Sequence, residues 1–199
     1  MDSLGIIGFI FGVVALAQCH ELKKEMETIK EDLENPDLIS YLNERSVSLT
    51  IARKSCVEVH YKVNNQSHFS IGLKYESGRY VLQNKNFKIS TVPEDFCFIN
   101  NGQPSLVVVQ GMFDMMTLKI LEPSLDSWAD ILVLNSAITD EKVIKQVLNY
   151  NRVLLFLKMN DSGRRITNNI MENHLNCSDR SDLYLGFEDL NDWLINLYE

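Results

Sequence analysis

The first part of the chain is apolar. Residues 4–17 contain no charged or strongly polar side chain, and Ser3, Gln18 and Cys19 extend the apolar span to 17 residues. This length is the lower limit for a helix that crosses a bilayer. Lysines follow the span and none precede it, so we expect residues 4–19 to anchor the protein at the cytoplasmic face of the inner membrane. A cytoplasmic protein, or a leader cleaved after the Ala15–Ala17 pair, is the alternative.

A heptad pattern follows. Apolar residues recur at spacings of four and three, which predicts a short helical stalk that ends at Asn35–Pro36. The seam consists of Ala15, Cys19, Leu22, Met26, Ile29 and Leu33. Gly8 and Gly12 form a small-x-x-x-small pair, so a homodimer through this pair and the stalk is one assembly that the pattern allows.

Residues 36–103 change from helical to strand-like periodicity. Residues 37–55 predict two short helices, with Asp37 as the first cap. Segments 57–63, 67–75, 78–84 and 85–90 predict an antiparallel meander. Basic side chains alternate with aromatic side chains in these segments. A face of this composition can bind single-stranded nucleic acid. The alternative is that the alternation buries the aromatic rings in the core. The candidate nucleic-acid-binding residues are Lys62, Lys74, Arg79, Lys85 and Lys88.

Residues 104–199 show a third hydrophobicity pattern, in which continuous apolar runs alternate with helix-like stretches. The runs at 106–110, 131–135 and 153–157 are typical of buried parallel strands. A helix from Arg165 to His174 and a fourth strand at Leu183–Leu185 complete the pattern. We therefore predict an α/β domain of about four parallel strands flanked by helices. A small α+β subdomain at 36–103 and an apolar helix with its stalk at 1–35 precede it.

Charge and cysteine content narrow the function. The net charge of -8 argues against a protein that coats nucleic acid by non-specific charge, although residues 36–104 carry eight basic and six acidic side chains. The four cysteines form no C-x-x-C pair, so we expect neither zinc nor a disulfide framework.

Three strand ends carry short polar motifs. Gln110-Gly111 and Asp114 follow the first apolar run, and Asp161-Ser-Gly163-Arg164 follows the third. The last motif is Asp189-Leu-Asn191-Asp192. Ligands gather at such ends in open α/β sheets. In order and spacing these motifs resemble the TOPRIM domain of DnaG-type primases, and residues 40–63 resemble the segment before TOPRIM in primase-like proteins of Bacteroidetes mobile elements.

The resemblance implies a magnesium site, and this chain departs from it. In the family a glutamate and two aspartates hold Mg²⁺, but Gln110 and Met159 stand at two of these positions. A neutral amide and a thioether are poor magnesium ligands, so the resemblance implies weak or absent Mg²⁺ binding. The expected catalytic residues are Asp161 and Asp114, and the expected metal ligands are Asp161, Asp189 and Asp192.

A phosphate site is predicted at the same motif. Gly163, Arg164 and Arg165 begin a helix, where backbone N–H groups and guanidinium groups bind phosphate. An ordinary helix start with exposed arginines is the alternative.

Three functions fit these observations. The first is a primase-related protein that binds single-stranded DNA or nucleotides with weak or lost phosphoryl-transfer activity. The second is an active DNA primase, a nucleotidyltransferase in DNA replication, or a nuclease, with a rearranged acidic set of Asp114, Asp161, Asp189 and Asp192. The third is a membrane-tethered protein-interaction module.

Overall fold

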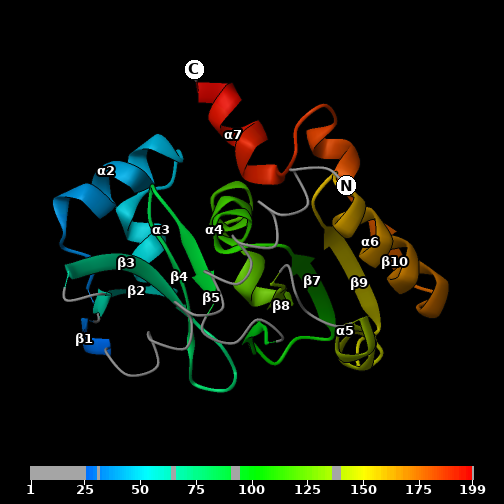
Figure 1. Ribbon diagram of the computed structural model, residues 1–199. Coiled ribbons are helices and arrows are strands. Elements are labelled where there is room, and N and C mark those ends of the chain that lie inside the picture. Colours follow the sequence, from blue (N-terminus) through cyan, green and yellow to red (C-terminus); the bar gives the residue numbers. More distant parts are fainter. Residues whose placement is uncertain (1–25, 31, 64–65, 91–94, 136–139, 199) are drawn as a thin grey trace, which may run out of the picture.

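The computed structural model describes residues 26–30, 32–63, 66–90, 95–135 and 140–198. These residues form two five-stranded sheets that lie side by side, with helices against both (Figure 1). Among them no helix is long and apolar enough to cross a bilayer. The predicted anchor at residues 4–19 and the pair Gly8 and Gly12 lie outside the described residues.

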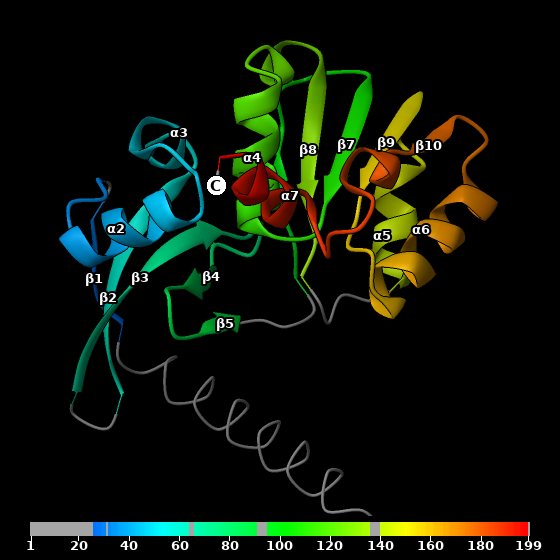
Figure 2. The same ribbon diagram turned by 90° about the horizontal axis from the view of Figure 1, so that it is seen from above.

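The first sheet is an antiparallel meander, as its alternating pattern predicts. Its strands, in spatial order, are β1 (Met26–Lys30), β2 (Cys56–Val63), β3 (Gln66–Lys74), β4 (Tyr80–Gln83) and β5 (Lys88–Ser90). The helices α2 (Pro36–Glu44) and α3 (Leu49–Arg53) pack on one face (Figure 2). Residues of the other face, among them Val59, Tyr61 and Leu82, form a separate small apolar cluster.

The stalk prediction is wrong where the structure tests it. Met26–Lys30 is a strand that pairs antiparallel with β2, and Ile29 is partly exposed rather than part of a helical seam. Leu33 is fully buried in the main core. The edge of β2 offers backbone hydrogen bonds to this β-branched stretch, so tertiary pairing overrides the helical period. The other seam positions, Ala15, Cys19 and Leu22, lie outside the described residues.

The cap of α2 also differs from the prediction. Asn35, not Asp37, is the N-cap, and its side-chain oxygen accepts a hydrogen bond from the Asp37 N–H at 2.9 Å. Pro36 follows as the first helical residue, where its missing N–H costs no hydrogen bond. The Asn-Pro pair therefore begins a helix rather than ending one.

Glu58 fixes the entry into α2. Its carboxylate is almost fully buried in β2 and accepts hydrogen bonds from the N–H groups of Glu34 at 2.9 Å and Asn35 at 2.7 Å. His60 donates to the same carboxylate. Burial alone would raise the pKa of Glu58, but these hydrogen bonds outweigh burial and lower it.

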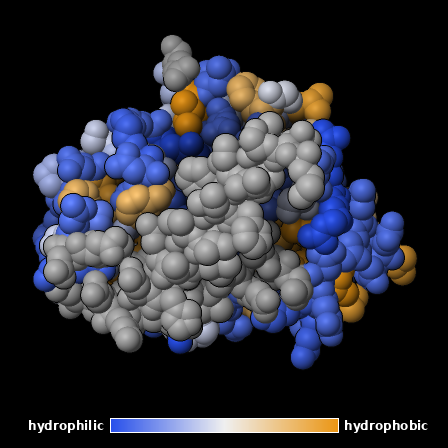
Figure 3. Space-filling view, viewed as in Figure 1, coloured by the Kyte–Doolittle hydropathy of each residue, from blue (hydrophilic) through white to orange (hydrophobic). Residues whose placement is uncertain are grey.

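The second sheet is parallel except at one edge. Its spatial order is β10 (Cys177–Asp179), β9 (Arg152–Phe156), β7 (Ser105–Val109), β8 (Ala129–Val133) and β6 (Cys97–Ile99), and β6 alone runs antiparallel. The helices α4 (Met112–Leu121) and α7 (Leu190–Tyr198) lie on the face toward the first sheet, while α5 (Asp140–Val147) and α6 (Asp161–Asn173) cover the opposite face (Figure 2). The outer surface over α5 and α6 is largely hydrophilic (Figure 3).

The fourth parallel strand exists, but the prediction placed it wrongly. It is Cys177–Asp179, whereas Leu183 and Tyr184 belong to a 3₁₀ turn, η2 (Ser181–Tyr184). Tyr184 is buried there, and its hydroxyl donates to the Leu157 carbonyl at 2.7 Å. The sequence of this segment resembles a strand because it contains a buried aromatic residue, Tyr184, whose hydroxyl has a hydrogen-bond partner. The preceding helix begins at Asp161 rather than at Arg165.

The two sheets share one core. Phe113 of α4 packs edge-on against Tyr41 of α2, with ring centroids 5.2 Å apart, and the Arg45 guanidinium lies 4.9 Å from the Phe113 ring centroid. The Asn191 side chain donates to the Arg45 carbonyl at 2.9 Å. A second 3₁₀ turn, η1 (Leu125–Ser127), leads from α4 into β8.

Replacing Glu58 tests this anchor. We expect Glu58→Gln to lower the free energy of unfolding by about 1 to 3 kcal/mol at pH 7, because the amide cannot accept all these hydrogen bonds. Since the folded pKa is below the unfolded value of 4.5, the difference from wild type is fully present above that pH. It shrinks as pH falls through the folded pKa. Urea unfolding at several pH values measures it. Glu76→Gln, at an exposed turn position, is the control, and an equal loss in both variants would contradict the anchor.

Candidate functional site at the strand edge

The topology creates a crevice between the carboxyl ends of β7 and β9. These strands are neighbours, yet the chain leaves β7 into α4 on one face and β9 into α6 on the other. This is a topological switch point, where open α/β sheets bind ligands. The motifs containing Gln110 and Met159 lie at these two strand ends.

Gly111 makes the turn from β7 into α4. Its φ of 143° lies in a region that side-chain-bearing residues rarely adopt. A Cβ at this position would lie 3.4 Å from Asp114 Oδ2 and 3.9 Å from Lys88 Nζ. The turn therefore brings a carboxylate from α4 and an ammonium group from β5 of the first sheet to the same point.

Asp114 is buried in the first turn of α4. Its carboxylate accepts a hydrogen bond from the Asn191 N–H of α7 at 3.2 Å. Burial and the nearby negative charge of Asp189 raise the pKa of Asp114 well above its usual value. This predicted catalytic residue is therefore present at the crevice, in surroundings that disfavour its charged form.

Gln110 ties the two strand ends together. It is buried, and its side-chain oxygen accepts a hydrogen bond from the Lys158 N–H at 3.3 Å. The Gln110 amide oxygen, at the position where the TOPRIM resemblance implies a glutamate, is thus engaged by the backbone of the neighbouring strand end.

Lys158 places a positive charge among the carboxylates. Its ammonium group lies 2.8 Å from Asp189 Oδ2 and 3.1 Å from Glu188 Oε1. Burial alone would lower the pKa of Lys158, but the hydrogen bond and charge of Asp189 raise it above the usual value. Desolvation and the nearby Lys158 lower the pKa of Lys88, while the charges of Asp114 and Asp189 oppose that shift.

The remaining carboxylates also have protein partners. Asp189 Oδ1 accepts from the Asp192 N–H at 2.9 Å and so caps the start of α7. Asp192 forms an ion pair with Arg45 at 3.5 Å. Burial and the charge of Asp189 raise the pKa of Asp192. Asp161 is exposed in the first turn of α6.

Met159 and Asn160 shape the loop from β9 into α6. The Met159 N–H donates to the Glu188 carbonyl at 2.7 Å, and its side chain packs against the main core. Asn160 caps α6 by accepting from the Gly163 N–H at 3.0 Å. A Cβ on Gly163 would lie 2.0 Å from the Lys158 carbonyl oxygen, so only glycine fits this close approach.

The predicted phosphate residues differ in their surroundings. The Gly163 N–H is already used by Asn160, and Arg165 forms an ion pair with Asp140. Arg164 donates through Nε to the Met159 carbonyl at 3.2 Å. It also lines a cavity of about 290 Å³ together with Lys158.

 

This cavity lies between the end of β9 and α6, and Thr167 and Ser181 add hydroxyl groups to its wall.

The described residues do not fit a magnesium ion. Among them no three histidine, cysteine, aspartate or glutamate side chains converge in a way that could hold a metal. Of the predicted ligands, Asp189 is engaged by Lys158 and Asp192 by Arg45. The amide of Gln110 and the sulfur of Met159 are not the oxygen-rich set that magnesium prefers.

The structure does not gather the five predicted nucleic-acid-binding cations on one face. Lys85 forms an ion pair with Glu44 at 2.7 Å, and Lys88 reaches the crevice. Lys62, Lys74 and Arg79 lie on β2, at the end of β3 and in the turn before β4, respectively. Several of the aromatic side chains that alternate with these cations in the sequence are buried, among them Tyr61, Tyr75 and Tyr80. This agrees with the alternative prediction, in which the alternation buries the rings in the core.

Sequence reasoning missed Lys158, Glu188 and the role of Asn191. Lys158 directly precedes Met159, so the available signal was a cation next to a position where the resemblance implies an acidic ligand. Nothing in the sequence indicates that Glu188 and Asn191 reach Lys158 and Asp114, because these contacts depend on how α7 returns to the sheet.

Comparisons with known proteins identify the fold. Residues 27–92 match the model of a domain of unknown function, DUF8464. No curated protein matches the chain. A chain in the structure of bacteriophage T7 lagging-strand DNA polymerase interacting with primase domains, bound to an RNA/DNA hybrid and dTTP, is similar with a TM-score of 0.59 and 16% identity. That match covers 79% of this chain and 85% of the other.

Two further primase structures agree. The primase fragment of the bacteriophage T7 primase-helicase has a TM-score of 0.55 and 18% identity, with 79% of this chain and 70% of that chain covered. The Aquifex aeolicus primase, with its zinc-binding and RNA polymerase domains, has a TM-score of 0.50 and 14% identity. That match covers 94% of this chain and 57% of the other. The fold is therefore primase-like.

Adding a methyl group at Gly163 tests the geometry of the β9–α6 turn. We expect Gly163→Ala to lower the free energy of unfolding by about 2 to 3 kcal/mol, because the new Cβ would overlap the Lys158 carbonyl oxygen. Ser162→Ala, one position earlier in the same turn, is the matched control and should change stability far less. Urea unfolding of the three proteins measures both effects. Equal stability of Gly163→Ala and wild type would show that the close approach is absent.

Proposed function

We propose that this chain is a primase-related protein of the TOPRIM type that binds single-stranded DNA or nucleotides and has weak or lost magnesium-dependent phosphoryl-transfer activity. The observation that carries the proposal is the Lys158 ammonium group, which lies 2.8 Å from Asp189 and 3.1 Å from Glu188 at the switch point. A lysine that is ion-paired with these carboxylates competes with a divalent cation for the same oxygens.

The donor set supports the loss of phosphoryl transfer. In such chemistry a magnesium ion supplies the positive charge that stabilises the transferring phosphoryl group. Gln110 is neutral and already hydrogen-bonded to the Lys158 backbone, and the partly buried side chain of Met159 packs against the core. Asp161 remains at its family position but is exposed and lacks its two family partners.

The cations at the crevice support binding of a phosphate-bearing ligand. Lys88 and Lys158 place two ammonium groups at the strand ends, and Arg164 lines the adjacent cavity. Phosphate groups bind to such fixed positive charges through charge-assisted hydrogen bonds. The T7 structure with a similar fold was determined with an RNA/DNA hybrid and dTTP, which agrees with a nucleic-acid or nucleotide ligand.

The cellular setting in this proposal comes from the sequence. Residues 4–19 would anchor the protein at the cytoplasmic face of the inner membrane, with a homodimer through Gly8 and Gly12 as one assembly. The resemblance of residues 40–63 to primase-like proteins of mobile elements would place the protein in the replication of such an element.

Binding without magnesium tests the proposal. We expect the full chain to bind a fluorescein-labelled single-stranded DNA oligonucleotide at low salt with equal affinity in Mg²⁺ and in EDTA. Arg164→Gln should weaken binding about tenfold, which corresponds to about 1.4 kcal/mol. Arg165→Gln is the matched control and should have less effect, because Asp140 already engages Arg165. Fluorescence anisotropy measures all four affinities.

Two results would contradict the proposal. Absence of binding to DNA and to nucleoside triphosphates at low salt would remove the binding function. Robust Mg²⁺-dependent primer synthesis on single-stranded DNA, abolished by Asp161→Ala, would show that catalysis persists and would favour the rearranged acidic set.

A further inference from the structure

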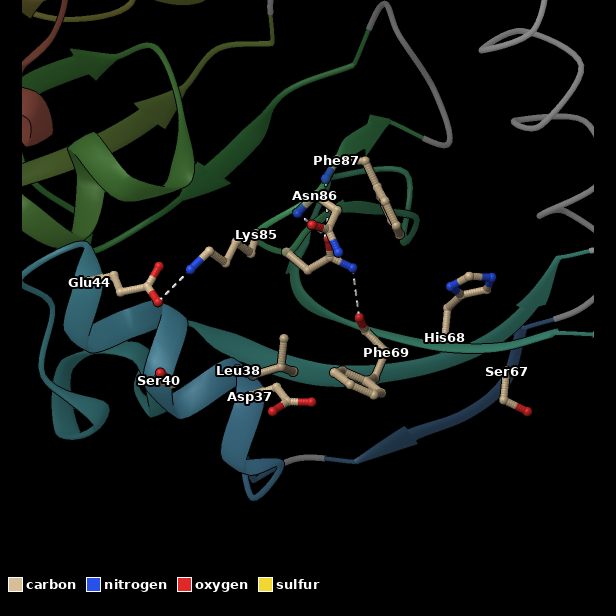
Figure 4. A pocket seen from close by; sticks show the side chains of 11 residues that line it. Asp37, Leu38, Ser40, Glu44, Ser67, His68, Phe69, Lys85, Asn86 and Phe87 are labelled. Atoms are coloured by element: carbon tan, nitrogen blue, oxygen red, sulfur yellow. Dashed lines mark hydrogen bonds and ion pairs between the residues drawn. The ribbon is translucent and has the colours of Figure 1, made fainter.

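A groove lies on the first sheet, away from the strand-edge crevice. It is a cavity of about 370 Å³ between α2, the start of β3 and the turn that joins β4 to β5 (Figure 4). Leu38 and Phe69 supply apolar surface, Asp37 and Glu44 supply carboxylates, and His68 and Phe87 lie at the other end. In Figure 4 the side chains of Leu38 and Phe69 lie next to each other beside α2.

An incompletely paired strand edge runs along this groove. β2 pairs with β3 from Gln66 to Leu73, but β4 pairs only with Ile71–Lys74. Among the described strands, residues 66–70 of β3 are therefore paired on one side only. An unpaired strand edge is a template for another extended segment.

Phe69 shows which backbone groups face the groove. Its carbonyl accepts a hydrogen bond at 3.0 Å from the side chain of Asn84, the residue that follows β4. Successive backbone groups of a strand point to opposite sides, so the N–H and carbonyl of Ser67 face the same way as those of Phe69. The stretch that lacks a described strand partner on this side, residues 66–70, is about 17 Å long.

We propose that this groove binds an extended segment of a partner protein, which adds to β3 as a strand along residues 66–70. Backbone hydrogen bonds to Ser67 would provide affinity, and alternate side chains would enter the groove. Apolar side chains of the segment fit against Leu38 and Phe69, and basic side chains face Asp37 and Glu44. The interaction is independent of the proposed nucleic-acid site on the other sheet.

Charge distinguishes this partner from nucleic acid. The groove contains the carboxylates of Asp37 and Glu44 and one lysine, Lys85, so its formal charge is two negative and one positive, or -1, with His68 neutral. Lys85 is already ion-paired with Glu44 at 2.7 Å. A phosphate backbone would be repelled here, whereas a basic peptide is attracted.

A designed peptide tests the proposal on the full chain. The probe is a fluorescein-labelled heptapeptide of alternating arginine and valine, and anisotropy should show saturable binding. We expect the double variant Asp37→Asn with Glu44→Gln, and separately Ser67→Pro, to weaken binding at least tenfold. Proline removes the N–H that faces the groove, and edge strands tolerate it. Glu76→Gln, an exposed acidic position at the β3–β4 turn, is the control and should bind like wild type.

Further experiments distinguish the proposed partner from other possible occupants of the groove. An alternating glutamate and valine heptapeptide should bind at least tenfold more weakly than the arginine peptide. Absence of saturable binding, or binding unchanged in both groove variants with their thermal midpoints intact, would overturn the proposal. Displacement of the peptide by single-stranded DNA would assign the groove to nucleic acid. Self-association of the wild type that Ser67→Pro abolishes would assign the edge to a second copy of the chain.

Discussion

Lys158, which lies two residues after β9, contacts several separate parts of the second half of the chain. Its N–H bonds to Gln110 of the β7 end, and its carbonyl lies directly against Gly163 of α6. Its ammonium group pairs with Asp189 and Glu188 before α7. One residue thus joins two strand ends, a helix start and the returning chain, so the position of each depends on the others.

This arrangement gives the crevice its chemical character. In a parallel sheet the switch point collects side chains from strands whose helices leave on opposite faces. Here those side chains include both ammonium groups and carboxylates, whereas the TOPRIM resemblance implies carboxylates alone. The pairing satisfies the buried charges within the protein, which weakens the electrostatic reason for a divalent ion to bind.

Strong periodicity could be read from the sequence, but contacts across elements could not. The continuous apolar runs predicted β7, β8 and β9, and the alternating segments predicted the meander. Met26–Lys30 was predicted as helix because its period fits a seam, yet pairing with β2 decides its structure. Tyr184 made a turn resemble a strand, because a buried ring with a hydrogen-bonded hydroxyl has no distinct sequence signature. The site motifs located the crevice, while Lys158 acquires its partners only when α7 folds back.

Titration of MgCl₂ into the full chain in a calorimeter tests the central claim, that an internal lysine occupies the electrostatic role of the metal at this crevice. The account predicts no saturable heat up to millimolar concentrations, for the wild type and for Asp161→Asn alike. Stoichiometric Mg²⁺ uptake by the wild type that disappears in Asp161→Asn would contradict it.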